Sequence, residues 1–231
     1  MGITISIMET STVKLVSYTT GCGELEGRSI EDIISYVARV SSPDNAKNFD
    51  TASKLIRYCI KNKHWSVFET ASVTFQITCP LAISSQILRH RSATFQQFSG
   101  RYAQMTTYTP VEARRQDTKN RQNSIDDMSE EDKQWFLESQ ERLWNQAKDA
   151  YDEAIKRGIA KESARFLLPL NTTTSMYVTN NIRGWIHYCD LRTANGTQRE
   201  HMEIAEKIKA ELVRLMPNVA EALEWTTEKT T

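Results

Sequence analysis

Nine consecutive residues, 71–79, alternate strictly between apolar and polar side chains, and this pattern constrains the fold more than any other. Val73, Phe75 and Ile77 fall on one side, and Thr74 and Gln76 fall on the other. A period of two predicts a β-strand with one face packed and one face wet. Further extended segments are predicted at residues 3–7, 13–18 and 172–179.

Helical signals lie between and after these strands. Ser29 and Asp32 have the spacing of a capping box, which predicts a helix that continues to residue 39. Pro80 suits the first turn of a following helix, and Asn180 and Asn181 suit the cap of another. The remaining predicted helices cover residues 46–62, 81–88, 131–157 and 198–216, with Gly158 and Pro217 as the stops of the last two.

The apolar faces of these helices predict how they pack. Ala52, Ile56 and Cys59 share a face, as do Ile182, Trp185, Ile186 and Cys189 on the helix after Asn181. The seam expected for the long helix consists of Phe136, Leu143, Ala147, Ala150 and Ala154. We therefore predict an α+β fold, with helices packed beside an antiparallel sheet, as a single domain over residues 1–231.

Composition limits the classes of function. Lys and Arg total 29 and Asp and Glu total 29, so the formal net charge is zero and a broad polyanion-binding surface is not indicated. No stretch approaches the roughly 18 apolar residues of a membrane span, and no secretory signal is recognisable. The cysteines, Cys22, Cys59, Cys79 and Cys189, show neither a paired motif nor metal-ligand spacing with histidine, so we expect reduced thiols, no metal and a cytoplasmic location.

Residues 111–132 are polar and charge-rich, with few apolar side chains. The pattern is typical of a solvated loop. A mobile flap over a binding site is the alternative, because functional loops have the same composition.

Residues 89–102 read RHRSATFQQFSGRY and carry the main functional signal. Arginine forks match phosphate oxygens two at a time, and hydroxyls and backbone amides near Gly100 can complete an anion site. Phe95 and Phe98 offer faces for a flat ring. The segment indicates a site for a phosphorylated, ring-bearing ligand, and the alternative is a solvated basic loop.

The segment resembles the signature of the flavin-dependent thymidylate synthases, in which Arg-His-Arg is followed by seven residues and a serine, here Arg89 to Ser99. Three more blocks resemble that family in the family's order: residues 64–69, residues 164–171, and residues 181–192. The resemblance implies a homotetramer whose active sites are each built from several subunits. It also implies FAD as cofactor, with NADPH and methylenetetrahydrofolate as co-substrates.

The resemblance also implies roles for individual residues. The implied FAD contacts are Ser41, His64, Arg89, His90, Arg91, Gln97, Asn181, Arg183 and His187, with a packed histidine beside Trp65 as the alternative for His64. The implied dUMP contacts are Gln86, Arg89, Gln97, Ser99, Gly100, Arg101, Arg165 and Arg192. Arg192 is the implied catalytic residue, since a guanidinium that stays charged can favour the N3-deprotonated uracil. The implied reaction is methylation of dUMP to dTMP.

Gln97 departs from the family, whose members commonly carry glutamate at this position. Glutamine keeps the size of glutamate and loses its charge. One alternative is therefore a catalytically weakened nucleotide-binding or flavin-binding relative. A second alternative, an RNA-binding module built on the arginine and aromatic residues, is disfavoured by the zero net charge and by the lack of a recognisable RNA-binding motif.

Overall fold

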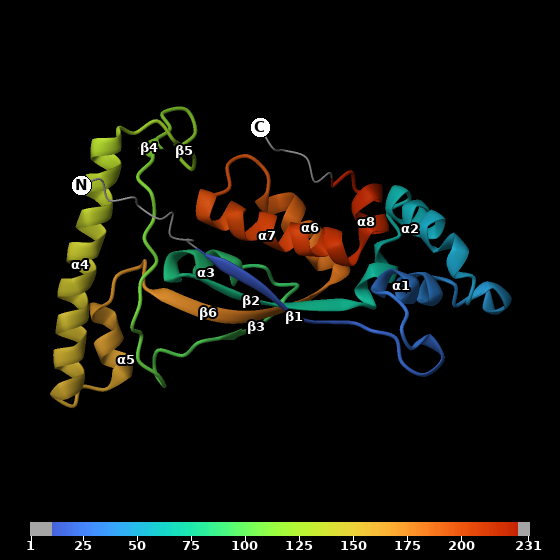
Figure 1. Ribbon diagram of the computed structural model, residues 1–231, viewed down its shortest axis with the longest axis horizontal. Helices are drawn as coiled ribbons and strands as arrows, with labels where there is room; N and C mark the ends of the chain where they lie inside the picture. Colours follow the sequence, from blue (N-terminus) through green and yellow to red (C-terminus); the bar gives the residue numbers. More distant parts are fainter. Residues whose placement is uncertain (1–10, 226–231) are drawn as a thin grey trace, which may run out of the picture.

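A four-stranded antiparallel sheet forms the centre of the molecule in the computed structural model, which describes residues 11–225 (Figure 1). The strands are β1 (Thr12–Tyr18), β2 (Ser72–Pro80), β3 (Thr94–Gln97) and β6 (Thr173–Asn181), in the order β1-β2-β6-β3. The predicted strands at 13–18, 71–79 and 172–179 are confirmed as β1, β2 and β6. The strand predicted at 3–7 lies outside the described residues.

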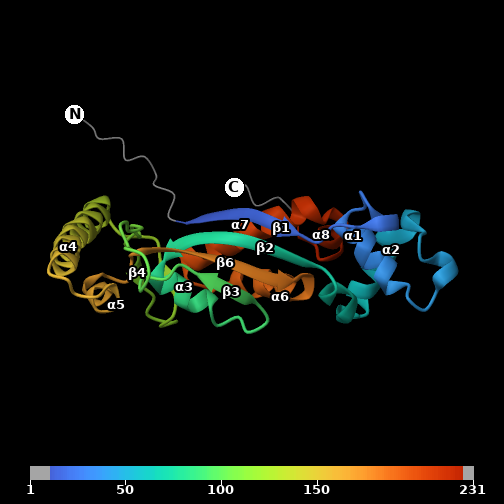
Figure 2. The same cartoon turned by 90° about the horizontal axis from the view of Figure 1, so that it is seen from below.

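The alternation along β2 decides which face of the sheet is covered. Val73, Phe75 and Ile77 are buried beneath α3 (Leu81–Ile87), α6 (Ile182–Arg192) and α7 (Arg199–Leu215), which lie together on one face of the sheet (Figure 2). On the opposite face, polar side chains bond across the strands, with 2.8 Å between the hydroxyl oxygens of Thr74 and Thr179. This arrangement confirms the predicted α+β class.

The remaining helices flank the sheet at its two ends (Figure 1). At one end are α1 (Ile30–Ala38), α2 (Ala52–Lys61) and α8 (Pro217–Ala222), and at the other are α4 (Glu130–Lys156) and α5 (Lys161–Ala164). Short 3-10 turns occur at Gly23–Leu25, Pro43–Asn45, Phe49–Thr51, Trp65–Glu69 and Arg165–Leu167. Within residues 11–225, no helix has both the length and the apolar character that crossing a membrane requires.

Several helix ends have the expected chemistry. Ser29 and Asp32 form the capping box of α1, and the Asn181 side chain accepts the backbone N–H of Gly184 at 2.8 Å to cap α6. Gly158 has a φ of 81° just past the end of α4, a conformation that glycine adopts without strain. Local sequence therefore sets these three boundaries.

Other boundaries differ from the prediction. The helix predicted at 46–62 begins only at Ala52, because residues 43–51 form two 3-10 turns in which Asn48 donates a side-chain hydrogen bond to Asn45 at 2.9 Å. Pro80 ends β2 and precedes α3 instead of lying in its first turn. Pro217 follows α7 and occupies the first position of α8.

The seam predicted for α4 is partly wrong. Ala154 is buried, but the other buried residues of this helix are Trp144 and Tyr151, and Leu143 is exposed. Trp144 is buried because its ring stacks on that of Tyr108, with 5.2 Å between the ring centroids. Tyr151 and Ala154 pack instead with Ala164 and Leu168, so two different neighbours select the buried stripe.

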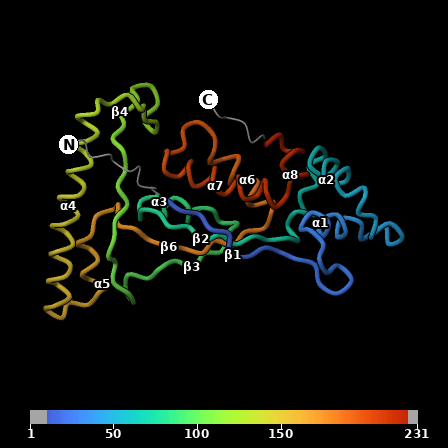
Figure 3. The backbone as a smooth tube through the Cα atoms, viewed as in Figure 1, coloured from blue at the N-terminus to red at the C-terminus, as the bar shows by residue number. Residues whose placement is uncertain are grey.

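Residues 98–129 run from β3 along α4 to the other edge of the molecule (Figure 3). They include a small hairpin of β4 (Arg115–Gln116) and β5 (Ser124–Ile125). The polar segment 111–132 therefore contains paired backbone, and the first residues of α4 belong to it. A flap function for this segment stays a prediction.

Candidate active site

A contact between Arg192 and His90 joins two of the predicted blocks. Arg192 is the last residue of α6, and His90 lies just beyond α3, so the packing of both helices on one sheet face brings them together. Arg192 Nε donates to His90 Nε2 at 2.9 Å. Among residues 11–225, no acceptor contacts the Nη groups of Arg192, so they can serve a ligand.

His90 is held in its neutral form. Burial, together with the charge of Arg192, lowers the pKa of His90 to about 4. A neutral imidazole has one acceptor nitrogen, and the Arg192 bond identifies it as Nε2. His90 therefore orients the guanidinium without adding a second positive charge.

Two buried residues that the sequence did not single out support this contact. The Tyr188 ring packs edge-on against the His90 ring, with 4.8 Å between centroids, and its hydroxyl lies 3.1 Å from His201 Nε2. His201 Nδ1 lies 3.2 Å from Gln86 Oε1, so Gln86 belongs to the same cluster. The available sequence signal was that His201 shares a face of α7 with the buried Ile204 and Ile208.

A second group of predicted residues lines a cavity of about 650 Å³ at the N-terminal end of α6. Its lining includes Asn181, Arg183 and His187, together with Trp65 and Ser92. Arg183 is paired with Glu69 across this cavity mouth. The volume is in the range of small-molecule sites, and the lining offers an aromatic face, amide groups and cations. Such a lining can take a flat heteroaromatic ring.

A third group gathers near α5. Gly100 is buried, and a Cβ atom at this position would lie 3.6 Å from Arg165 Cδ and 3.0 Å from Met105 Sδ. A larger residue here would press on the Met105 side chain. Arg101 Nε donates to Glu162 Oε2 at 3.0 Å, and Ser99 turns the chain by accepting two backbone N–H groups through its carbonyl oxygen. Ser99, Gly100, Arg101 and Arg165 thus lie in one region.

Gln97 connects β3 to α3. Its Nε2 donates to Ser84 Oγ at 3.2 Å and to Thr174 Oγ1 at 3.3 Å. The Ser84 hydroxyl donates its own proton to the Leu81 carbonyl at 2.9 Å, whereas the Thr174 hydroxyl can also donate. Thr174 could therefore donate to a carboxylate at position 97. β3 itself was missed in the sequence, where residues 89–102 were treated as one ligand-binding segment.

Ser41 lies apart from these groups, whereas His64 directly precedes Trp65, which lines the cavity at the start of α6. Ser41 is exposed after α1, at the end of the molecule opposite α4 (Figure 1). Next to it, the buried Arg39 donates to Thr51 Oγ1 at 2.8 Å, while its Nη1 has no partner and its side chain lines a cavity of about 670 Å³. His64 is exposed and contacts the ring of Tyr58 edge-on.

Of the six candidate ligand-binding arginines, Arg101 and Arg183 pair with carboxylates and, among residues 11–225, the other four do not. Within the described part of the chain, Arg89, Arg91, Arg165 and Arg192 have no carboxylate partner. Several arginines elsewhere are paired, including Arg57, Arg115, Arg157 and Arg214. An unpaired guanidinium is a free donor for an anionic ligand, so the local positive field lies where the sequence predicts a phosphate site.

Comparisons with known proteins show the family. The model of the thymidylate synthase complementing protein family matches residues 14–218. A probable flavin-dependent thymidylate synthase of Paramecium bursaria Chlorella virus 1 is 50% identical over 214 residues, which is 92% of this chain and 98% of the relative. The flavin-dependent thymidylate synthase of Synechocystis sp. is 47% identical over 215 residues, covering 92% of this chain and 99% of the relative.

A solved structure resembles the whole fold. The UMP/dUMP methylase PolB from Streptomyces cacaoi, crystallised with 5-Br dUMP, superposes with a TM-score of 0.80 at 28% identity, covering 93% of this chain and 95% of PolB. This chain belongs to the flavin-dependent thymidylate synthase family.

Proposed function

We propose that this protein methylates dUMP to dTMP, with methylenetetrahydrofolate as the carbon donor and NADPH-reduced FAD as the hydride source. The observation that carries the proposal is Arg192, whose Nε is held by neutral His90 while its Nη groups have no protein acceptor among residues 11–225. A fixed guanidinium beside uracil favours the N3-deprotonated ring and raises electron density at C5, where the new carbon bond forms.

The remaining candidates hold the nucleotide. Ser99, Gly100, Arg101 and Arg165 bind the phosphate of dUMP, and the packing of Gly100 against the Arg165 side chain supports this assignment because it brings a guanidinium next to the Ser99–Arg101 turn. Gln86, Arg89 and Gln97 contact the nucleoside. No nucleophilic side chain is needed, and burial raises the pKa of the Cys79 thiol to about 12, which suits a packing role.

The flavin site is the cavity at the start of α6. Asn181, Arg183 and His187 line the ring-binding part with His64 nearby, and Arg89, His90 and Arg91 extend it. Ser41 binds near the flavin phosphates, where the unpartnered Nη1 of buried Arg39 fits an anion. When bound, the flavin supplies the redox chemistry, and the protein supplies orientation and electrostatics.

We further propose a cytoplasmic homotetramer with shared active sites. The three groups of candidate residues occupy separate regions of one chain, which supports a site completed by neighbouring subunits. Tyr102, Phe166 and Leu170 are 86%, 83% and 74% exposed, and large apolar side chains of this kind are typical of interfaces. Four free cysteines fit a reducing compartment.

The test is dUMP-dependent NADPH oxidation in the presence of methylenetetrahydrofolate, with dTMP measured directly and UMP assayed in parallel. We expect dTMP to form, and a purified protein that absorbs at about 450 nm, the flavin band. A colourless protein that cannot be reconstituted with FAD would overturn the proposal. The rival reading, a relative weakened at Gln97, predicts ligand binding without turnover, and relatives at 50% and 47% identity named as synthases do not favour it.

A further inference from the structure

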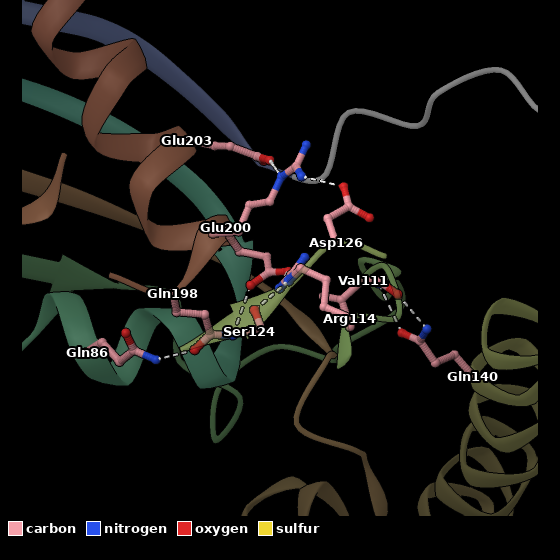
Figure 4. A network of polar contacts seen from close by, with 10 residues as sticks. Gln86, Val111, Arg114, Ser124, Asp126, Gln140, Gln198, Glu200 and Glu203 are labelled. Carbon is pink, nitrogen blue, oxygen red and sulfur yellow. Dashed lines mark hydrogen bonds and ion pairs between the residues drawn. The ribbon is translucent and has the colours of Figure 1, made fainter. Parts of the chain in front are cut away.

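A buried ion pair lies behind the predicted nucleotide site and begins a chain of directional hydrogen bonds. Arg114, from the polar segment before β4, pairs with Glu200 of α7, and their side chains are 11% and 4% exposed. Arg114 Nε also donates to Ser124 Oγ at 3.1 Å. Figure 4 shows this pair joined through Gln198 to Gln86.

The carboxylate of Glu200 fixes the direction of every bond that follows. An ionised carboxylate only accepts, so Gln198 must present its amide nitrogen, and Gln198 Nε2 lies 2.9 Å from Glu200 Oε2. The oxygen of Gln198 then accepts from Gln86 Nε2 at 2.7 Å. Each amide has one nitrogen and one oxygen, so the orientation of Gln86 is set.

The same polarity continues into the core. With its nitrogen turned to Gln198, Gln86 presents Oε1 to His201 Nδ1 at 3.2 Å, so Nδ1 carries the proton. His201 Nε2 then accepts from the Tyr188 hydroxyl at 3.1 Å. Burial, with the charge of Arg192, lowers the pKa of His201 to about 3, so the ring is neutral and holds one tautomer at pH 7.

We propose that Glu200 and Gln198 are positioning residues for dUMP, because they hold the Gln86 amide in one orientation from behind the site. The proposal rests on the proposed function, in which Gln86 contacts the nucleoside. Without this chain of bonds, a half-turn of the Gln86 amide exchanges its donor and its acceptor at nearly the same positions. A ligand that binds only one of the two orientations then has a lower apparent affinity, because only part of the protein is in that orientation.

The chain also ties residues 111–125 to the site. Gln140 of α4 accepts the backbone N–H of Val111 at 3.0 Å and donates to its carbonyl at 2.8 Å, while Arg114 is held by Glu200. The segment is thus fastened to α4 and to α7.

Gln198→Met is the main test. Gln198 is exposed, so the variant removes the middle of the chain without emptying the core. We expect the dissociation constant for dUMP to rise about fivefold, the effect of one lost hydrogen bond. Glu200→Gln is the second variant, and it abolishes the acceptor-only end of the chain. Calorimetric titration of dUMP into the FAD-loaded enzyme measures both, and thermal unfolding reports on the fold.

Glu203→Gln is the matched control. It is also an acid-to-amide change on α7 in a glutamate that pairs with an arginine, with 3.1 Å between Arg199 Nε and Glu203 Oε1. The control variant should bind dUMP like the wild type. Equal dUMP affinity in wild type and folded Gln198→Met would overturn the inference while leaving the proposed function intact.

A double-mutant cycle decides whether the effect passes through Gln86. In a Gln86→Ala background, we expect Gln198→Met to have no further effect on dUMP affinity. A persisting fivefold loss would mean that Gln198 acts by another route and would overturn the inference. Failure of the wild-type protein itself to bind dUMP would instead overturn the proposed function, and the inference with it.

Discussion

Arg192→Lys keeps the positive charge at the end of α6 and removes the planar guanidinium. In the wild type, Nε contacts His90 Nε2 at 2.9 Å and both Nη groups can donate to uracil. A lysine has a single ammonium at the end of a flexible chain. It can contact His90 or the ligand, but it cannot hold both at a fixed angle.

The expected loss follows from that geometry. Removal of one preorganised donor to a developing negative charge lowers kcat by about 100-fold, which corresponds to about 2.7 kcal/mol of transition-state stabilisation. Affinity for dUMP should fall much less, because Ser99, Gly100 and Arg165 lie in a separate region and are unchanged. Flavin absorbance should also be retained.

The assay is dTMP formation in a single turnover of pre-reduced enzyme, with dUMP and methylenetetrahydrofolate both saturating. Arg199→Lys is the control, because Arg199 lies on the surface in ion pairs with Asp126 and Glu203. The control should react at the wild-type rate. A rate for Arg192→Lys within about threefold of the wild type, less than 1 kcal/mol, would refute the role assigned to Arg192.

Three further predictions address other parts of the molecule. Gln97→Glu should preserve or raise the rate of dTMP formation, because the Thr174 hydroxyl can turn to donate to a carboxylate. A large loss of turnover with dUMP binding intact would reject this. Burial raises the pKa of Glu31, so its contribution to stability is present below the unfolded pKa of about 4.3 and is lost as pH rises through the folded pKa. In urea unfolding, the stability of the wild type relative to Glu31→Gln should therefore decrease as pH rises above this value, and an increase would contradict the reasoning. Trp185→Phe should lower the free energy of unfolding by about 2 kcal/mol, because it removes the 2.9 Å bond from Nε1 to the Val73 carbonyl within the core; urea unfolding that is unchanged would show that the bond contributes nothing.

The sequence by itself determined the elements whose signals are local. The alternation along residues 71–79 requires only the two-residue period of a strand, and it correctly identified the buried face of β2. Ser29 and Asn181 cap helices through bonds to residues three positions away, so their roles could be predicted without tertiary information. The signature at residues 89–102, together with the blocks at residues 64–69, 164–171 and 181–192, likewise identified the family.

Elements that depend on a partner were not predictable from the sequence. β3 consists of four residues and exists because β6 offers its edge. The buried stripe of α4 is set by its partners, with Tyr108 covering Trp144 and Ala164 covering Tyr151. A short segment can be a strand or a loop, and a helix with apolar residues on two faces can bury either face, at nearly equal local free energy. The packing neighbour therefore decides which is observed.

The candidate site shows the same division. Residue types and spacing indicated which arginines could serve an anion, because that chemistry belongs to the side chain. Only the tertiary structure decided that His90 receives Arg192 and that Gln86 is held by Gln198, partners 102 and 112 residues apart. A hydrogen bond requires atoms within about 3 Å at a defined angle, and in this protein the packing of α3, α6 and α7 on one face of the sheet creates that geometry.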